Sequence, residues 1–401
     1  MPLGLFPLPS PSDLTSLFTR FVKALAAHDY AATWSIPTPG RAWHVLREPT
    51  NIARFLGGGN NAFEASPWSG LYRRAFAARK PDTILLYEAF HLGQPAARAD
   101  LARTLGEELV SEMEARGVLV PKGSELVARA RATGFDPLIV VSDTPSIHEH
   151  EKGSFVFCGR CSSRLGEAVR EELQAARPRR KRSLDLCTGS GIQAINGAAS
   201  FDEVWGGDLN PRAVAFAQAN AAANGVTHAR FVESDLFANL QGTFDLVTAN
   251  TPFLLLDEGS KALDGYGGKY GMEVELRLFA DLDRYLSPGG TSLVVASSAF
   301  VEGKNLLEDR LREMFTGKDY AIDLFPISQY YSPDHYRAYE AANVRKCILY
   351  IVRARKDAAS GLVLTDHPYG AITGASLDVK VQLQRQIARR RFQKRQGENR
   401  P

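Results

Sequence analysis

The sequence predicts a two-domain α/β protein: a mostly helical amino-terminal region to about residue 150, then a seven-stranded sheet with helices between its strands. At 401 residues the chain exceeds one typical domain, and 44% hydrophobic residues suffice for ordinary cores. From Ser183 onward, short apolar runs alternate with turns and helical patterns, which is typical of a mostly parallel sheet. From Asp82 to about residue 150, short helices separated by Gly and Pro predominate instead.

Residues 1–80 are expected to form a helical cap. A helix is predicted near Leu14 to Ala27, and three tryptophans and a flexible run at Gly57 to Gly59 follow it. These aromatic residues would cover the active site, although aromatic side chains are more often part of a core. The tryptophans are Trp34, Trp43 and Trp68.

Residues 81–150 are predicted to form three helices and a small hairpin. The helices are Thr83 to Leu92, Ala97 to Leu105 and Glu107 to Arg116, and a turn at Lys122 to Ser124 lies in the hairpin. This order resembles a winged helix. A nucleic-acid-binding winged helix needs a basic third helix, but this one carries four Glu and a single Arg. Dimerisation or substrate presentation is therefore favoured over nucleic-acid binding.

A glycine-rich turn follows the first apolar strand of the second half. Leu184 and Leu186 indicate a buried strand, and Gly189 and Gly191 let the backbone turn tightly into a helix beginning near Ile192. A ligand can then approach the main-chain N–H groups at the start of this helix. Taken alone, such a turn also occurs in binding sites for dinucleotides and for phosphates. The candidate binding residues here are Asp185, Thr188, Gly189, Ser190 and Gly191.

An acidic residue ends the next predicted strand, Glu203 to Gly207. Asp208 lies about 20 residues after the turn, where a carboxylate can accept hydrogen bonds from both hydroxyl groups of a ribose. Leu209 and Asn210 complete this part of the candidate site. The dinucleotide spacing of glycines is not met, because position 194 is Ala, and this lowers the expectation of NAD.

A second acidic strand end follows one helix later. The Ala-rich helix Arg212 to Asn224 begins after Asn210-Pro211 and stops at Gly225, and the strand Val226 to Val232 follows. One acid alone could be a helix cap or a turn residue, but three signatures in this order argue against that. The carboxyl end of the strand adds three candidate residues: Ser234, Asp235 and Leu236.

The fourth signature is Asn250-Thr251-Pro252-Phe253. It follows the apolar strand Phe244 to Ala249, at the edge where open parallel sheets bind their ligands. The side-chain oxygen of Asn250 and the carbonyl of Thr251 could each accept one N–H of a planar amino group, and Phe253 could stack on its plane. These hydrogen bonds would orient a delocalised lone pair and stabilise the positive charge that develops on nitrogen. No general base is needed before attack.

Together the four signatures resemble those of class I S-adenosylmethionine (SAM) methyltransferases, which have a Rossmann-like fold. The resemblance implies that Asp208 holds the ribose, that Asp235 accepts a hydrogen bond from the adenine amino group, and that Leu236 or Phe237 packs on the ring. It also implies S-adenosylhomocysteine as the product. The catalytic residues that it implies are Asn250, Thr251, Pro252 and Phe253, with Asn250 also contacting the cofactor.

Two further features refine the resemblance. Relatives commonly carry a second proline where this chain has Thr251. The main-chain carbonyl is kept despite this change, but the rigidity that a proline gives to the loop is not implied. The segment Leu263 to Val274, with Ser287-Pro288-Gly289-Gly290 after it, is similar to release-factor glutamine methyltransferases and to small-domain ribosomal RNA guanine methyltransferases. The resemblance spans roughly Ser183 to Arg355. It implies N-methylation of a protein or RNA, in preference to methylation at oxygen or carbon.

Two other functions stay open. A tailoring methyltransferase for a small molecule or peptide would use its amino-terminal half for dimerisation and as a lid, with an enclosed acceptor cavity. The protein or RNA hypothesis instead predicts an open, basic approach to Asn250. A DNA-binding regulator that senses SAM would need a basic recognition helix, which the acidic third helix does not provide.

The remaining strands are predicted at Thr291 to Ser297, Ile322 to Phe325 and Cys347 to Arg353. We expect the methyltransferase domain to span residues 151–357 and a carboxyl-terminal extension to span 358–401. From residue 378 onward the extension holds eight Lys or Arg against two acidic residues. Apolar residues at helical spacing accompany this charge, so the tail could bind nucleic acid or a membrane surface, or stay solvated.

The chain has no apolar run long enough to cross a bilayer and no signal-peptide pattern at its start, so a cytoplasmic protein is expected. Its four cysteines are expected to be free thiols, with Cys187 and Cys347 on core strands. Cys158 and Cys161 have metal-ligand spacing, and two histidines, at 148 and 150, lie upstream. A single Cys pair beside the apolar strand Phe155 to Phe157 favours a substrate-side strand and turn over a zinc site. No metal is assigned.

Overall fold

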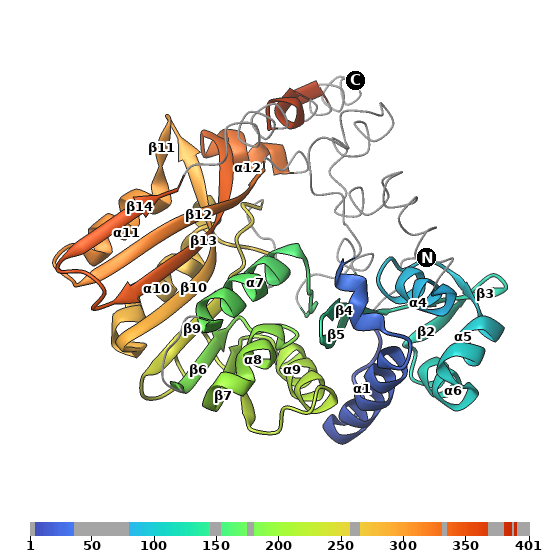
Figure 1. Ribbon diagram of the computed structural model, residues 1–401. Coiled ribbons are helices and arrows are strands. Elements are labelled where there is room, and N and C mark those ends of the chain that lie inside the picture. The colour runs from blue at the N-terminus through green and yellow to red at the C-terminus, as the bar shows by residue number, and fades with distance from the viewer. Residues whose placement is uncertain are drawn as a thin grey trace. The chain divides into compact units, whose positions relative to one another are not determined.

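The computed structural model describes residues 5–35, 80–144, 154–174, 180–256, 265–330, 335–367, 381–386 and 389–390 (Figure 1). The chain divides into two compact units. Unit 1 comprises Met1–Pro37, Ser69–Gln241 and Ala262–Asp264, and unit 2 comprises Thr38–Trp68, Gly242–Lys261 and Gly265–Pro401. The domain boundaries expected from the sequence stay a prediction. Trp43, Trp68, the glycine run at 57–59 and His148 and His150 lie outside the described residues.

The amino-terminal part of unit 1 is largely helical, as expected. A three-stranded antiparallel sheet has the order β1-β3-β2, and β4 and β5 form a separate antiparallel hairpin. The winged-helix interpretation stays a prediction. The elements are α1 (Pro11–Ala26), η1 (Tyr30–Ser35), α4 (Pro81–Phe90), β1 (Ala96–Ala97), α5 (Arg98–Leu105), α6 (Glu107–Ala115), β2 (Leu119–Lys122), β3 (Glu125–Ala128), β4 (Ala130–Phe135) and β5 (Leu138–Asp143).

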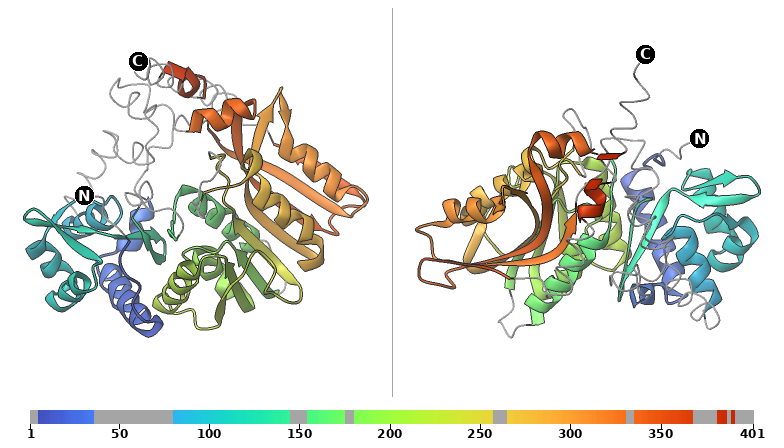
Figure 2. Two further views of the ribbon diagram at one scale, coloured as in Figure 1. Left: turned by 180° about the vertical axis from the view of Figure 1, so that it is seen from behind. Right: turned by 90° about the horizontal axis from the view of Figure 1, so that it is seen from above.

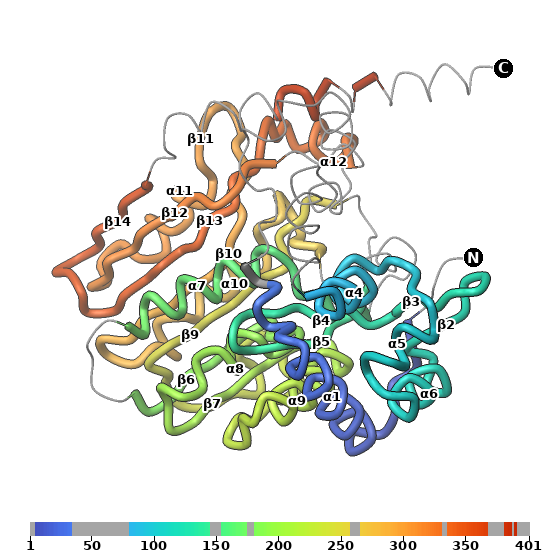
Figure 3. The backbone as a smooth tube through the Cα atoms, turned by 45° about the vertical axis from the view of Figure 1, so that its right-hand side comes forward, coloured from blue at the N-terminus to red at the C-terminus, as the bar shows by residue number. Residues whose placement is uncertain are grey.

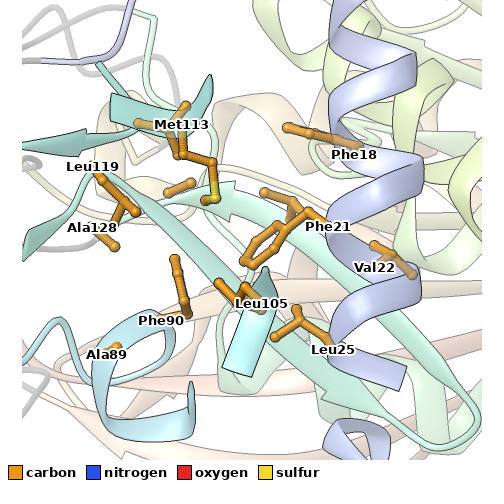
Figure 4. Packing of buried hydrophobic residues seen from close by; sticks show 14 of the residues in the cluster. Phe18, Phe21, Val22, Leu25, Ala89, Phe90, Leu105, Met113, Leu119 and Ala128 are labelled. Carbon is orange, nitrogen blue, oxygen red and sulfur yellow. The ribbon is translucent and has the colours of Figure 1, made fainter. Parts of the chain in front are cut away.

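One face of α1 organises the core of this region. Figure 4 shows Phe18, Phe21 and Leu25 projecting from α1 among the buried side chains of the neighbouring elements. The rings of Phe21 and Phe90 meet edge to face, with their centroids 4.7 Å apart. Because such buried aromatic contacts are among the largest contributors to core stability, α1 fixes the helices after residue 80 in place.

Unit 1 continues with a parallel sheet in the order β6-β7-β8 and the helices between its strands. Helix α1 runs alongside α9, where the rings of Phe18 and Phe216 lie 5.2 Å apart (Figure 3). The elements are α7 (Arg160–Gln174), β6 (Arg180–Leu186), α8 (Ile192–Gly197), η5 (Ala198–Ser200), β7 (Phe201–Asp208), α9 (Pro211–Ala223) and β8 (Ala229–Glu233).

Two amides on α9 bind the backbone of strand β5. Asn220 accepts from the N–H of Val141 at 2.8 Å and donates to its carbonyl at 2.8 Å. Asn224 pairs in the same way with Ile139, at 3.1 and 2.8 Å. Side chains four residues apart on a helix are about 6 Å apart, close to the roughly 6.6 Å between alternate strand residues, so the two amides match the register of β5. These amides satisfy backbone groups of β5 that its partner strand β4 does not bind.

Three details differ from the sequence predictions. Strand β8 begins at Ala229 rather than Val226, because the N–H of Val226 still closes the end of α9 on the carbonyl of Ala221. Phe155 to Phe157 is not a strand, since the N–H of Val156 bonds to a side-chain oxygen of Asp143 instead of to a ladder partner. Cys187 follows β6 rather than lying in it and has a positive φ of 51°.

In unit 2 the strands are hydrogen-bonded in the order β14-β12-β13-β10-β9 and curve strongly (Figure 2). Strands β9 and β10 are parallel, whereas β13 runs antiparallel to both β10 and β12. The elements are β9 (Phe244–Asn250), η6 (Lys269–Gly271), α10 (Glu273–Tyr285), β10 (Leu286–Val301), β11 (Lys304–Asn305), α11 (Leu306–Phe315), β12 (Tyr320–Tyr330), α12 (Tyr336–Ala341), β13 (Val344–Lys356) and β14 (Leu362–Asp366).

The mixed α/β fold class is confirmed. All seven strands predicted for the sheet are present as β6, β7, β8, β9, β10, β12 and β13, and Cys347 lies buried in β13. Strands β11 and β14 are additional. Of the basic tail, the described residues 381–386 and 389–390 are helical.

Candidate functional site

The glycine-rich turn of unit 1 depends on backbone conformations that only glycine adopts easily. Gly189 and Gly191 have φ of 53° and 81°. A Cβ on Gly191 would lie 3.0 Å from the Cα of Ala217, so α8 and α9 can approach only because no side chain is there. Thr188 ties the turn to the sheet, because its N–H donates to the Gly207 carbonyl at 3.1 Å and its hydroxyl donates to Asp185 at 2.7 Å.

Asp208 joins the turn to the end of β7. Its Oδ2 accepts the N–H of Gly189 at 2.9 Å, and its Oδ1 accepts the N–H of Asn210 at 2.9 Å. Burial raises the pKa of the Asp208 carboxyl, and the two N–H donors oppose that rise. An ionised carboxylate has about four acceptor sites, so two stay available toward solvent on this partly exposed side chain.

The end of β8 is hydrogen-bonded to the end of β7 at Asp208. The N–H of Ser234 donates to the Asp208 carbonyl at 2.9 Å, and the Ser234 hydroxyl donates to the Leu236 carbonyl at 2.7 Å. Leu236 has a positive φ of 50°, and Asp235 is exposed. The structure therefore brings three of the four sequence signatures together within unit 1.

The candidate residues of unit 1 fall into two groups. Asp185, Thr188, Ser190 and Ser234 are each at most 4% exposed, so the structure uses them to hold the loops. Other groups have exposed surface: Asp208 and Gly189 are partly exposed, Asp235 is exposed, and Leu209 is 52% exposed. Asn210 is buried and caps α9 by accepting the N–H of Arg212 at 3.0 Å. The ligand contacts of all these residues stay predictions.

The fourth signature lies in unit 2, where Asn250 ends β9 opposite Val295 of β10. The next residue, Thr251, is 1% exposed, and its hydroxyl donates to the Val295 carbonyl at 2.9 Å. Where relatives commonly have a proline, this chain thus fastens the loop with a side-chain hydrogen bond. The Phe253 carbonyl faces Gly271, on which a Cβ would lie 2.5 Å from that oxygen, so residue 271 must be glycine.

Unit 2 contains a buried acid that was not among the predicted site residues. Glu275 is fully buried, its Oε1 accepts the N–H of Ser297 at 3.0 Å, and among the described residues its Oε2 has no hydrogen-bond partner. Burial raises its pKa well above the usual value, which favours the neutral acid. The signal was present, because Glu275 shares the helical spacing of the buried Leu278, Phe279 and Leu282.

Glu275→Gln is expected to change how stability depends on pH. In the wild type the unfolded chain ionises above about pH 4.5 while the folded acid stays neutral, so stability is full below that pH and falls as pH rises toward the folded pKa. The slope is at most about 1.4 kcal/mol per pH unit. Urea unfolding at pH 5, 6 and 7 should show the variant gaining on the wild type with rising pH. A difference that stays constant over this range would contradict a neutral Glu275.

The four cysteines are free thiols. Cys158 is buried just before α7, and Cys161 lies in its first turn. Burial raises the pKa of Cys158, and it raises that of Cys161 to about 11. The raised pKa lowers the thiolate fraction of both residues near neutral pH. The described residues contain no group of three or more His, Cys, Asp or Glu side chains that could hold a metal ion.

The family model of the methyltransferase small domain matches residues 156–320 of the chain. A putative protein N5-glutamine methyltransferase of Methanocaldococcus jannaschii is 38% identical over 122 residues, which are 29% of this chain and 61% of that protein. A release factor glutamine methyltransferase of Deinococcus radiodurans is 36% identical over 135 residues, or 31% of this chain and 48% of that protein. The chain thus spans about half of the length of the curated relatives it matches.

Among solved structures, the chain is similar to a T. thermophilus 16S rRNA N2 G1207 methyltransferase in complex with AdoMet and guanosine. That match has 20% identity and a TM-score of 0.37, and it covers 65% of this chain and 63% of the other. Within the part of the chain that the structure describes, no helix combines the length and the apolar character that a membrane crossing requires.

Proposed function

We propose that the protein, whose residues 156–320 match the family model of the methyltransferase small domain, transfers a methyl group from SAM to a planar amino or amide nitrogen of a protein or RNA. The observation that carries the proposal is the environment of Asp208. Its carboxylate is fixed by the N–H groups of Gly189 and Asn210 and keeps acceptor capacity toward solvent. A ribose with two hydroxyl groups fits that arrangement.

The remaining exposed groups of unit 1 also fit SAM. The large apolar surface of Leu209 beside Asp208 would be covered by the adenine ring, and Asp235 would accept a hydrogen bond from its amino group. The missing side chain of Gly189 leaves space for the methionine portion, since the nearest atom to a Cβ there would be the Phe157 carbonyl oxygen at 3.8 Å. Bound SAM supplies a methyl group activated by a sulfonium sulfur.

The loop of unit 2 would hold the acceptor. Asn250 Oδ1 and the Thr251 carbonyl each accept one N–H of the acceptor nitrogen, which aims its lone pair and stabilises the charge that develops. Phe253 packs on the plane of the acceptor. The nitrogen loses a proton to solvent after the N–C bond forms, so no side chain has to remove it beforehand.

The names of the relatives support a protein glutamine or a ribosomal RNA as the acceptor. Within unit 1, the acids of α6 are paired with arginines of the helices around it. Arg20 binds Glu112, while Arg98 binds Glu107 at 2.6 Å and Glu114 at 2.9 Å. An acidic helix with these intramolecular partners does not suit phosphate binding, so we propose that this region presents the substrate or forms a homodimer. A role in DNA binding is disfavoured for the same reason.

A small-molecule or peptide acceptor is the second candidate, and one experiment separates the two. The full-length protein is incubated with SAM labelled in its methyl group and with cell lysate, and the products are treated with ribonuclease or with protease and resolved by size. The proposal is supported if the label is found in a macromolecule that ribonuclease or protease degrades. Label in a small compound that survives both supports the tailoring alternative. The absence of any transfer with active lysate would count against a methyltransferase.

Thr251→Val is expected to slow methyl transfer about fivefold, because the loop loses a hydrogen bond worth roughly 1 kcal/mol while the Thr251 carbonyl is kept. Thr251→Ser is the matched control, because it keeps the hydroxyl and should stay within about twofold of the wild type. Transfer rates at saturating SAM measure both variants. Equal losses in the two variants would show that the hydroxyl is not what fixes the loop.

A further inference from the structure

A chain of hydrogen bonds lies against the acceptor loop inside unit 2. The Tyr330 hydroxyl donates to the Phe253 carbonyl at 3.1 Å, and Ser297 Oγ lies 2.9 Å from the Tyr330 oxygen. The main-chain N–H of Ser297 donates in turn to Oε1 of Glu275 at 3.0 Å. These three residues form the Tyr330–Ser297–Glu275 chain.

The direction of each bond in this chain is fixed by the groups present. A carbonyl oxygen can only accept, so the Tyr330 proton points to Phe253, and the Ser297 hydroxyl must then donate to the Tyr330 oxygen. The chain depends on Tyr330 keeping its proton. Burial of the hydroxyl raises the pKa of Tyr330 well above its usual value, so the donor persists throughout the neutral range.

Strand β10 fastens the acceptor loop at two points. Val295 accepts the Thr251 hydroxyl, and Ser297, two residues further along β10, holds Tyr330 against Phe253. The rings of Phe253 and Tyr330 also lie 6.1 Å apart at an angle of 60°. The start of the four-residue loop is thus held directly by the strand, and its end is held through Tyr330.

We propose that Tyr330, held in turn by Ser297 and Glu275, is a positioning residue that fixes the Phe253 carbonyl and thereby the plane on which a planar amide or aromatic amine is presented. This inference rests on the proposed function. It adds a residue 77 positions from Phe253 that acts through the backbone of the loop.

Tyr330→Phe tests the inference, because it removes only the hydroxyl. The control is Tyr320→Phe, on the same strand β12, where a buried tyrosine loses its bond to Asp283 away from the loop. Hydrogen–deuterium exchange of the loop amides at residues 253–256 should speed up about fivefold to tenfold in Tyr330→Phe and stay unchanged in the control. A second variant, Ser297→Ala, should give a smaller increase, because it loosens Tyr330 without removing its hydroxyl.

Transfer kinetics supply the second readout. Tyr330→Phe should lower kcat about tenfold while the Kd for SAM stays at its wild-type value, whereas Tyr320→Phe should change neither. Loop exchange and kcat both equal to the wild type in Tyr330→Phe would overturn the inference. Failure of the wild type to transfer methyl would refute the proposed function instead, and the exchange measurement would still decide whether Tyr330 fixes the loop.

Discussion

Asn250→Ala is expected to lower methyl transfer by about a hundredfold to a thousandfold while SAM binding is retained. The variant removes the side-chain oxygen that would accept one N–H of the acceptor nitrogen, so the lone pair is no longer aimed and the developing charge is no longer stabilised. Asn250 ends β9 with its backbone paired to β10, and circular dichroism checks that the variant keeps this fold. Initial rates with labelled SAM, together with calorimetric SAM binding, measure the two effects separately.

Asn250→Asp is the matched control, because it keeps acceptor oxygens at the same position. It should retain transfer within about tenfold of the wild type. If Asn250→Ala methylated at the wild-type rate, the role assigned to this residue would be wrong, whatever the result for SAM binding.

Asp143→Ala is expected to have the largest effect on stability, lowering the free energy of unfolding by about 3–5 kcal/mol. Arg212 of α9 binds both oxygens of Asp143 at 2.7 and 3.0 Å, and the two side chains are 7% and 0% exposed. Arg212 also lies over the rings of Phe6 and Phe216, at 4.7 and 4.9 Å. Removing the carboxylate would leave this guanidinium buried without its counter-charge.

Chemical denaturation of two further variants, a double variant and a surface control, completes this test. Replacing both partners with apolar residues, as Asp143→Leu with Arg212→Met, should recover much of the loss, since no charge is then left buried. Arg103→Ala, which removes a surface ion pair with Asp82, should change stability little. An Asp143→Ala protein as stable as the wild type would show that the buried pair does not stabilise unit 1.

The strands and the chemistry near Asp208 could be predicted because they depend on local patterns. Apolar runs that end in Gly or Asp mark the strand ends, and the glycine turn needs the positive φ that glycine allows. The predicted ends of helices and strands were less accurate where a single hydrogen bond determines them. At Val226, the N–H bonds to the Ala221 carbonyl and closes α9 before β8 begins. Phe155 to Phe157 was predicted as a strand because its apolar character does not reveal whether a ladder partner exists.

Long-range polar contacts could not be predicted from local patterns. Arg212 pairs with Asp143 across 69 positions, and Tyr330 reaches Phe253 across 77. Asn220 and Asn224 looked like ordinary residues of an Ala-rich helix, yet their amides hold the backbone of β5. The loss of a proline at Thr251 was visible in the sequence. Its replacement by a hydroxyl bond to Val295 became evident only once β9 and β10 were paired.

Calorimetric titration of the full-length protein with S-adenosylhomocysteine tests the cofactor site most directly, because it needs no knowledge of the methyl acceptor. We expect one binding site in the wild type and an affinity roughly tenfold to a hundredfold lower in Asp208→Ala, in which the ribose loses its acceptor. Circular dichroism confirms that both proteins are folded. No affinity of the folded wild type for this nucleoside or for SAM, or equal affinity in Asp208→Ala, would contradict the site proposed at the end of β7.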